Sequence, residues 1–143
     1  MITKEDMEAM AEERLEFEFM SGSLGVMGMV KEFAETMGQE PNPELSATLV
    51  DEEYTEWGDE HYGNSHGHFG YTDEKELKEL SDLVYVIYGY ASVRGWNLDE
   101  AVRRVHENNI GRCVQPDGSI NRSETGKILK NKDYPKVELG DLV

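Results

Sequence analysis

The chain has 143 residues, a length that suits one domain with a single core. Hydrophobic residues make up 38% and charged residues 31% of it, which is typical of a globular protein and far from the disordered extreme. Thirty acidic and fourteen basic residues give a net charge of −16, which argues against nucleic-acid or anionic-membrane partners.

Two helices are predicted before residue 38. Thr3 is a suitable cap for a helix over residues 3–20, because the methionines that follow it fall at helical spacing. A second helix is expected over residues 24–37, since this segment carries an apolar stripe and is followed by Gly38 and a proline-containing turn.

A third helix is predicted over residues 44–58, after a start signal at Asn42 and Pro43, and acidic residues continue its apolar stripe. At steps of four, three, one and three, this stripe consists of Leu45, Leu49, Glu52, Glu53 and Glu56. Ionised carboxylates at a helix interface repel one another and lose hydration, so they need cations to neutralise them. The stripe therefore indicates a metal site.

Residues 58–72 are expected to form a loop, because they are rich in glycine and have no periodicity. They contain His61, His66 and His68, which are possible ligands for a transition metal. No cysteine accompanies these histidines, and a mobile lid or surface loop is the alternative.

Asp73 and Glu76 form a weak capping box, which predicts a long helix that ends at Gly95. Glu79 lies on one face of this helix, and Asp82 lies one turn beyond it. Between residues 80 and 91 the helix is apolar nearly all round, which favours burial in an interface between copies of the chain.

A last helix is predicted from a capping box at Asn97 and Glu100 to about Asn109. The segment after Gly111 is expected to be extended or rich in turns. The predicted fold is therefore all-α, an antiparallel bundle of four to five helices with an extended C-terminal arm. We expect one domain over residues 1–143, with an N-terminal helix in 1–22 and the arm in 111–143.

The spacing of the acids indicates the chemistry of the site. Residues three apart on a helix share a face, so Glu53 with Glu56, and Glu79 with Asp82, each present a pair of carboxylates. A site lined only by oxygen favours Mg²⁺ or Mn²⁺ over zinc, and Mg²⁺ held in this way commonly meets substrate phosphates. The hypothesis is a metal-dependent hydrolase that acts on a phosphoric anhydride. A di-iron bundle is the competing site, but it expects Glu-x-x-His pairs, which neither helix has.

Cations gather in the last third of the chain and favour phosphate binding there. They are Arg112, Arg122, Lys127, Lys130, Lys132 and Lys136. A cationic arm of this kind is suited to holding phosphates, although a solvated basic tail is the alternative. Gly126-Lys127 does not complete a Walker A motif, because Asn121 replaces its first glycine and Ile128 its Ser or Thr.

Taken together, these segments resemble a known family. The segments are Glu52-Glu53-Tyr54-Thr55-Glu56, Glu79-Leu80-Ser81-Asp82, Asn108-Asn109-Ile110-Gly111-Arg112 and Gly126-Lys127-Ile128-Leu129-Lys130. Their order resembles the all-α nucleoside triphosphate pyrophosphohydrolases of the MazG-like superfamily, and most of all the phosphoribosyl-ATP pyrophosphohydrolase-like branch. The similarity covers roughly residues 30 to 143.

The resemblance implies cleavage between the α- and β-phosphates of a nucleoside triphosphate, which yields a monophosphate and pyrophosphate. It implies that Mg²⁺, with Mn²⁺ as a substitute, is bound by Glu53, Glu56, Glu79 and Asp82. Glu52 is implied as a further ligand or as the base for the attacking water, and Asn109, Arg112, Lys127 and Lys130 as contacts to the nucleotide and its phosphates. Family members form homodimers or homotetramers.

Some viral relatives act on purine deoxynucleotides, which makes dGTP or dATP the expected substrate. Phosphoribosyl-ATP hydrolysis is one alternative, and a non-catalytic acidic helical module that binds a basic protein is another. The single Cys113, together with the lack of a signal peptide or an apolar run of roughly 18 residues, predicts a cytoplasmic protein, in the host cytoplasm if it is viral.

Overall fold

The computed structural model of the chain describes residues 1–20 and 25–143, without the side chains of residue 11 and residues 14–20. The end of the predicted N-terminal segment 1–22 and the predicted helix start at residue 24 thus lie outside the described residues. The chain forms two compact units, Met1–Gly95 and Trp96–Val143. The assignment of residues 1–143 to one domain stays a prediction.

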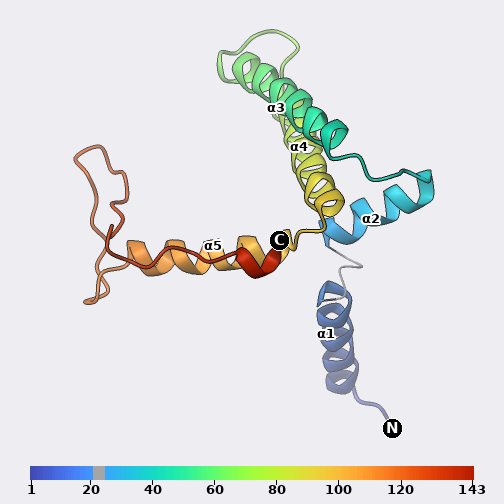
Figure 1. The fold of residues 1–143 in the computed structure, drawn as a ribbon. Helices are drawn as coiled ribbons and strands as arrows, with labels where there is room; N and C mark the ends of the chain where they lie inside the picture. Colours follow the sequence, from blue (N-terminus) through green and yellow to red (C-terminus); the bar gives the residue numbers. More distant parts are fainter. Residues whose placement is uncertain (21–24) are drawn as a thin grey trace. The chain divides into compact units, whose positions relative to one another are not determined.

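The all-α prediction is confirmed: the described residues form five α-helices and no strand (Figure 1). The first unit contains α1 (Lys4–Met20), α2 (Val26–Met37), α3 (Pro43–Ser65) and α4 (Asp73–Arg94). The second contains α5 (Leu98–Cys113) and a short 3-10 helix, η1 (Gly140–Leu142). No helix that the structure describes combines the length and the apolarity needed to cross a bilayer.

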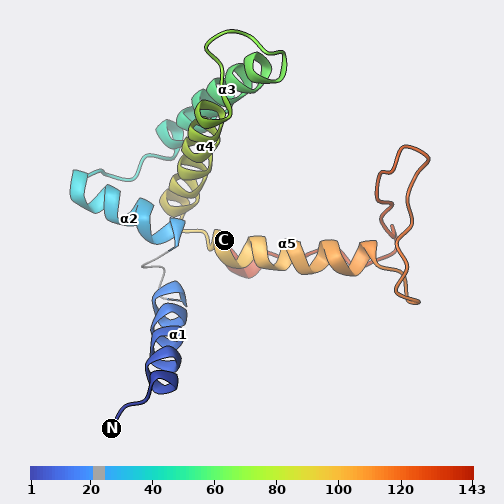
Figure 2. The same cartoon turned by 180° about the vertical axis from the view of Figure 1, so that it is seen from behind.

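Helices α3 and α4 form an antiparallel hairpin, which both views of the ribbon show (Figures 1 and 2). Helix α2 packs against α4, and Met27 and Val30 of α2 are buried together with Ala91 of α4. Among the described side chains, these three are the only buried hydrophobic ones. Residues of α3 thus lie beside residues of α4 that are distant from them in the sequence.

Most of the predicted helix ends are confirmed. The Asn42 side chain accepts a hydrogen bond from the Leu45 amide at the start of α3, and Asn97 does the same for Glu100 at the start of α5. Gly38 and Gly95 end their helices with φ of 61° and 72°, a left-handed conformation that glycine adopts without strain. At the start of α4 the cap is Thr72, which accepts from the Lys75 amide, and not Asp73 as predicted.

The loop predicted over residues 58–72 is wrong for its first half, because α3 continues to Ser65. Polar contacts to α4 hold these last turns. Asn64 Nδ2 donates to Asp73 Oδ1 at 2.7 Å and to Glu76 Oε2 at 2.8 Å, and His61 Nδ1 lies 2.8 Å from Glu76 Oε1. These contacts reach across to α4 and do not form an apolar stripe along α3, so hydrophobic periodicity does not reveal this segment.

Helix α5 also runs further than predicted, to Cys113 instead of about Asn109, so the arm begins at Val114 and not at residue 111. The arm then returns along α5 within the second unit (Figures 1 and 2). The Asn131 amide donates to the Arg112 carbonyl at 2.7 Å, and Asn108 Nδ2 donates to the Pro135 carbonyl at 2.8 Å. These contacts to the arm support the last turns of the helix.

Candidate functional site

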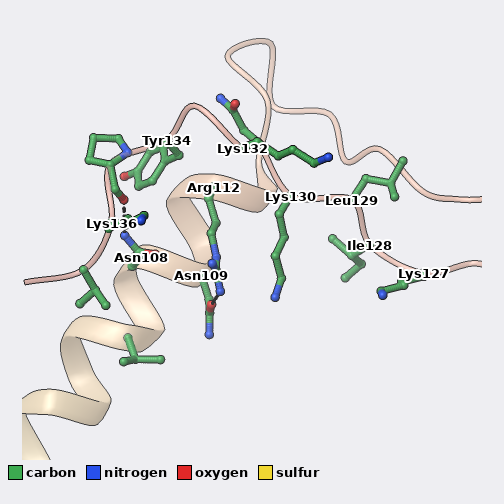
Figure 3. Close-up of a pocket in the computed structure, with 14 residues that line it drawn as sticks. Asn108, Asn109, Arg112, Lys127, Ile128, Leu129, Lys130, Lys132, Tyr134 and Lys136 are labelled. Atoms are coloured by element: carbon green, nitrogen blue, oxygen red, sulfur yellow. Dashed lines mark hydrogen bonds between the residues drawn. The ribbon is translucent and has the colours of Figure 1, made fainter.

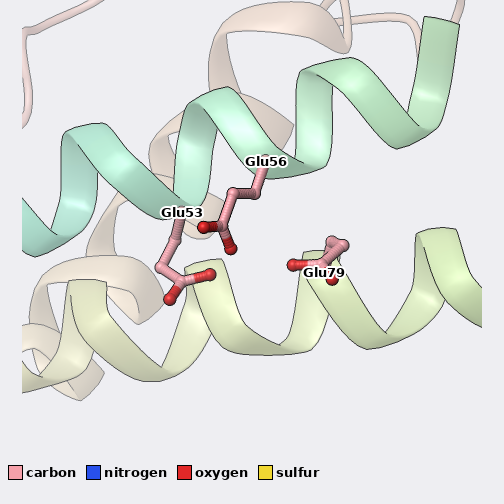
Figure 4. Close-up of side chains that lie close together, drawn as sticks. All are labelled: Glu53, Glu56 and Glu79. Carbon is pink, nitrogen blue, oxygen red and sulfur yellow. The ribbon is translucent and has the colours of Figure 1, made fainter.

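Carboxylates of α3 and α4 converge in the first unit. Glu53 and Glu56 point from α3 toward Glu79 of α4 (Figure 4). One carboxylate oxygen from each of the three residues lies within 4.8 Å of the other two. The three-residue spacing puts the first two acids on one face of α3, and the hairpin supplies the third.

The cluster is electrostatically unfavourable without a cation. Burial raises the pKa of the Glu53 carboxyl, and the negative charges of Glu56 and Asp82 raise it further. Oε2 of Glu53 and Oε2 of Glu79 are both buried and have no hydrogen-bond partner. Ionisation of Glu53 therefore costs folding free energy unless a positive charge is bound nearby.

These residues fit a hard divalent cation. The cluster offers only oxygen, which suits Mg²⁺ or Mn²⁺ better than zinc. The partnerless buried oxygens of Glu53 and Glu79 are the atoms that such a cation would satisfy. Exposed acidic groups often occur without a metal, so the buried oxygens are the informative part of the cluster.

Two other predicted residues have different surroundings. Asp82 lies outside the three-residue cluster, and its Oδ2 pairs with Lys78 Nζ at 2.6 Å. The same ammonium group lies 3.4 Å from Glu79 Oε1. Glu52 is exposed on α3 and is also outside the cluster. The roles of Asp82 and Glu52 stay predictions.

Sequence reasoning misses Glu60, whose Oε2 is also buried without a hydrogen-bond partner. Glu60 follows Glu56 by four residues and thus continues the same face of α3. The four-residue spacing is the signal that could have found it. The predicted helix ends at residue 58, however, so the stripe read from the sequence does not reach this residue.

The histidines at the end of the hairpin have protein partners. His61 contacts Glu76 and stacks on Trp57 with ring centroids 5.3 Å apart. His66 Nδ1 lies 2.8 Å from the Tyr62 carbonyl oxygen. Within the described residues, no histidine belongs to a group of three potential metal ligands. The transition-metal hypothesis for these residues has no support in this geometry.

The predicted phosphate-binding residues meet in the second unit. A cavity of about 960 Å³ lies between the C-terminal half of α5 and the returning arm (Figure 3). Asn109, Arg112, Lys127 and Lys130 all line it. Arg112 Nη2 donates to Asn109 Oδ1 at 2.6 Å, which joins two of these residues. Lysines from the arm thus face the same space as an arginine from the helix.

Comparison with known proteins adds no relative: no family model matches the chain, and no curated protein matches it.

Proposed function

We propose that this protein is a Mg²⁺-dependent nucleotide pyrophosphohydrolase, which cleaves the α–β phosphoanhydride of a (deoxy)nucleoside triphosphate. The observation that carries the proposal is the cluster of Glu53, Glu56 and Glu79, whose carboxylate oxygens lie within 4.8 Å of one another. In this cluster Glu53 and Glu79 each have a buried oxygen without a hydrogen-bond partner. The cationic cavity and the resemblance to the MazG-like superfamily support the same reaction.

In this proposal Glu53, Glu56 and Glu79 hold the cation, with Asp82 as a fourth ligand. A Mg²⁺ ion held there would supply positive charge to neutralise phosphate and to make a nearby water a better nucleophile. Glu52 or Glu53 accepts the proton of the water that attacks the α-phosphorus. The bond between the α-phosphorus and the bridging oxygen breaks, and pyrophosphate leaves with the electron pair. Asn109, Arg112, Lys127 and Lys130, which line the cavity of the second unit, stay the expected contacts to nucleotide phosphates.

A substrate panel tests this reaction. The protein is incubated with Mg²⁺ and each ribo- and deoxynucleoside triphosphate, with dGTP, dATP and phosphoribosyl-ATP included, and pyrophosphate is measured. We expect release of pyrophosphate and a nucleoside monophosphate. Release of orthophosphate alone, or no turnover with any member of the panel, would contradict the proposal.

Glu53→Gln is the matching variant. It removes a ligand and a repelling charge together, so we expect loss of turnover and of the Mg²⁺-induced rise in melting temperature. The metal-free variant should be at least as stable as the parent chain. Asp59→Asn, which removes an exposed charge from the same helix, should keep both properties.

If neither the parent chain nor the Asp59 variant shows a thermal shift with Mg²⁺ or Mn²⁺, the acidic helices are better explained as a binding surface for a basic protein. A sharp fall in the melting temperature of metal-free Glu53→Gln would instead indicate a structural ion network.

A further inference from the structure

The cavity of the second unit is lined by five cationic side chains and, among the lining residues that the structure describes, by no carboxylate. The cations are Arg112, Lys127, Lys130, Lys132 and Lys136. They represent five of the fourteen basic residues of a chain with a net charge of −16. The charge of this cavity is therefore opposite in sign to the net charge of the chain. The cavity attracts anions, whereas the negative net charge of the chain repels them.

The described residues supply no internal counter-ion for these cations. Among the ion pairs of the described residues, none joins a cation of the cavity to a carboxylate. Nε of Arg112 is buried and lacks a hydrogen-bond partner. Like charges that face one space without counter-ions repel one another, so a bound anion would relieve the repulsion.

Contacts between the arm and α5 build the cavity before any ligand is present. The Asn131 amide and the Asn108 side chain fix the arm to α5 at two points, and the Tyr134 ring lies directly over Gly111. A Cβ at Gly111 would overlap the Tyr134 hydroxyl oxygen, so only glycine allows this approach. The lysines are therefore carried on an arm that is already tied to the helix.

We infer that this cavity is a polyphosphate site that works without a metal, in which Lys132 and Lys136 extend the set formed by Arg112, Lys127 and Lys130. Its volume of about 960 Å³ is sufficient for a chain of phosphates with or without a nucleoside. The inference rests on the proposed function for the origin of the phosphates, but the binding itself requires neither Mg²⁺ nor turnover.

The test is calorimetric titration of the full chain in EDTA with sodium tripolyphosphate and, separately, with dGTP. We expect saturable binding of tripolyphosphate that weakens steeply as salt is raised. Binding of dGTP but not of tripolyphosphate would overturn the inference, because the nucleoside would then be the recognised part. Absence of binding for both ligands would overturn it as well.

The double variant Lys132→Ala/Lys136→Ala should weaken tripolyphosphate binding by about tenfold, as expected for the loss of two solvent-accessible ionic contacts. Lys4→Ala/Lys31→Ala removes the same charge from exposed positions of the first unit and should leave the affinity unchanged. Equal weakening in both double variants would show an effect of net charge and would overturn the assignment.

This titration contains no metal and measures no turnover. It can therefore fail while pyrophosphate is still released in the presence of Mg²⁺, and it can succeed for a chain that has no hydrolase activity.

Discussion

Lys78 contacts two of the predicted metal ligands, Glu79 and Asp82, which lie on the same helix, α4. Its ammonium lies 2.6 Å from Asp82 and 3.4 Å from Glu79. The hydrogen bonds to Asp82 and then to Glu79 raise the pKa of Lys78. Lys78 therefore partly neutralises the same carboxylates that a divalent cation would bind.

We expect Lys78→Met to bind Mg²⁺ a few-fold more tightly than the parent chain, because the competing charge is removed. The metal-free variant should melt at a lower temperature, since Asp82 and Glu79 lose their partner. Isothermal titration with MgCl₂ measures the first effect and thermal melting the second.

Lys75→Met is the control. Lys75 lies on the same helix but donates to the Gly70 carbonyl oxygen at 2.6 Å instead of to an acid of the cluster. Equal changes in Mg²⁺ affinity for the two variants would show that net charge, rather than the contact of Lys78, controls the affinity.

Near the C-terminal end of α3, the side chain of Tyr71 packs closely against Gly63. This glycine is buried, and a Cβ there would overlap the ring of Tyr71. Gly58, five residues earlier in α3, has no atom within 4 Å of the corresponding position. The two glycines of one helix thus differ in what a methyl group would meet.

We expect Gly63→Ala to destabilise the chain by about 1–3 kcal/mol, because the ring of Tyr71 must move. Gly58→Ala should stabilise it by about 0.5–1 kcal/mol through the higher helix propensity of alanine. Urea denaturation of both variants measures the difference. If Gly63→Ala is as stable as Gly58→Ala, Tyr71 does not pack on α3 in solution.

The end of the arm is attached to α5 by an acid-sensitive network. Arg104 bonds to Asp141 Oδ1 at 2.6 Å and to Glu100 Oε1 at 2.9 Å. Hydrogen bonds from Arg103 and Arg104 lower the pKa of Glu100 to about 2, and Arg104 lowers the pKa of Asp141. A carboxyl whose pKa is lowered by folding stabilises the fold above its unfolded value, and this contribution is lost as the pH falls.

We therefore expect the contact between η1 and α5 to weaken as the pH falls below about 3.8, the ordinary pKa of Asp141, because protonation removes the charge that binds Arg104. The amide resonance of Leu142, followed by NMR over this range, reports the change. Asp141→Asn should show a smaller change, because the carboxylate that binds Arg104 is absent. An unchanged Leu142 resonance in the parent chain would contradict the expectation.

Over the described part of the chain as a whole, much apolar surface remains uncovered. Leu80, Val84 and Ile87 of α4 are 41%, 40% and 38% exposed. Val84 also lines, with Leu77 and Tyr85, an apolar cavity of about 370 Å³. Surface of this kind on a long helix is typical of subunit interfaces. It is consistent with the expected homodimer or homotetramer, which stays a prediction.

We expect light scattering to give a mass of two or four times 16.3 kDa for the chain. Val84→Lys places a charge on the apolar face of α4 and should lower this mass. Val143→Lys, at a C-terminal residue that is 77% exposed, should not. A monomeric parent chain would contradict the prediction.

Features that depend on neighbouring residues could be predicted from the amino-acid sequence. The caps at Asn42 and Asn97, the helix-ending glycines and the shared face of Glu53 and Glu56 follow from local geometry, and the structure has all of them. The all-α class follows from the same helical periodicities.

What lies opposite each of these faces could not be predicted in this way, because it depends on the folded chain. Whether Glu79 or Asp82 meets the acids of α3 is set by the alignment of the hairpin, and the polar contacts that carry α3 to Ser65 join two helices. The cavity that Arg112 shares with the lysines depends on where the arm returns along α5. Spacing along one helix contains no information on such contacts, because they join segments that only folding brings together.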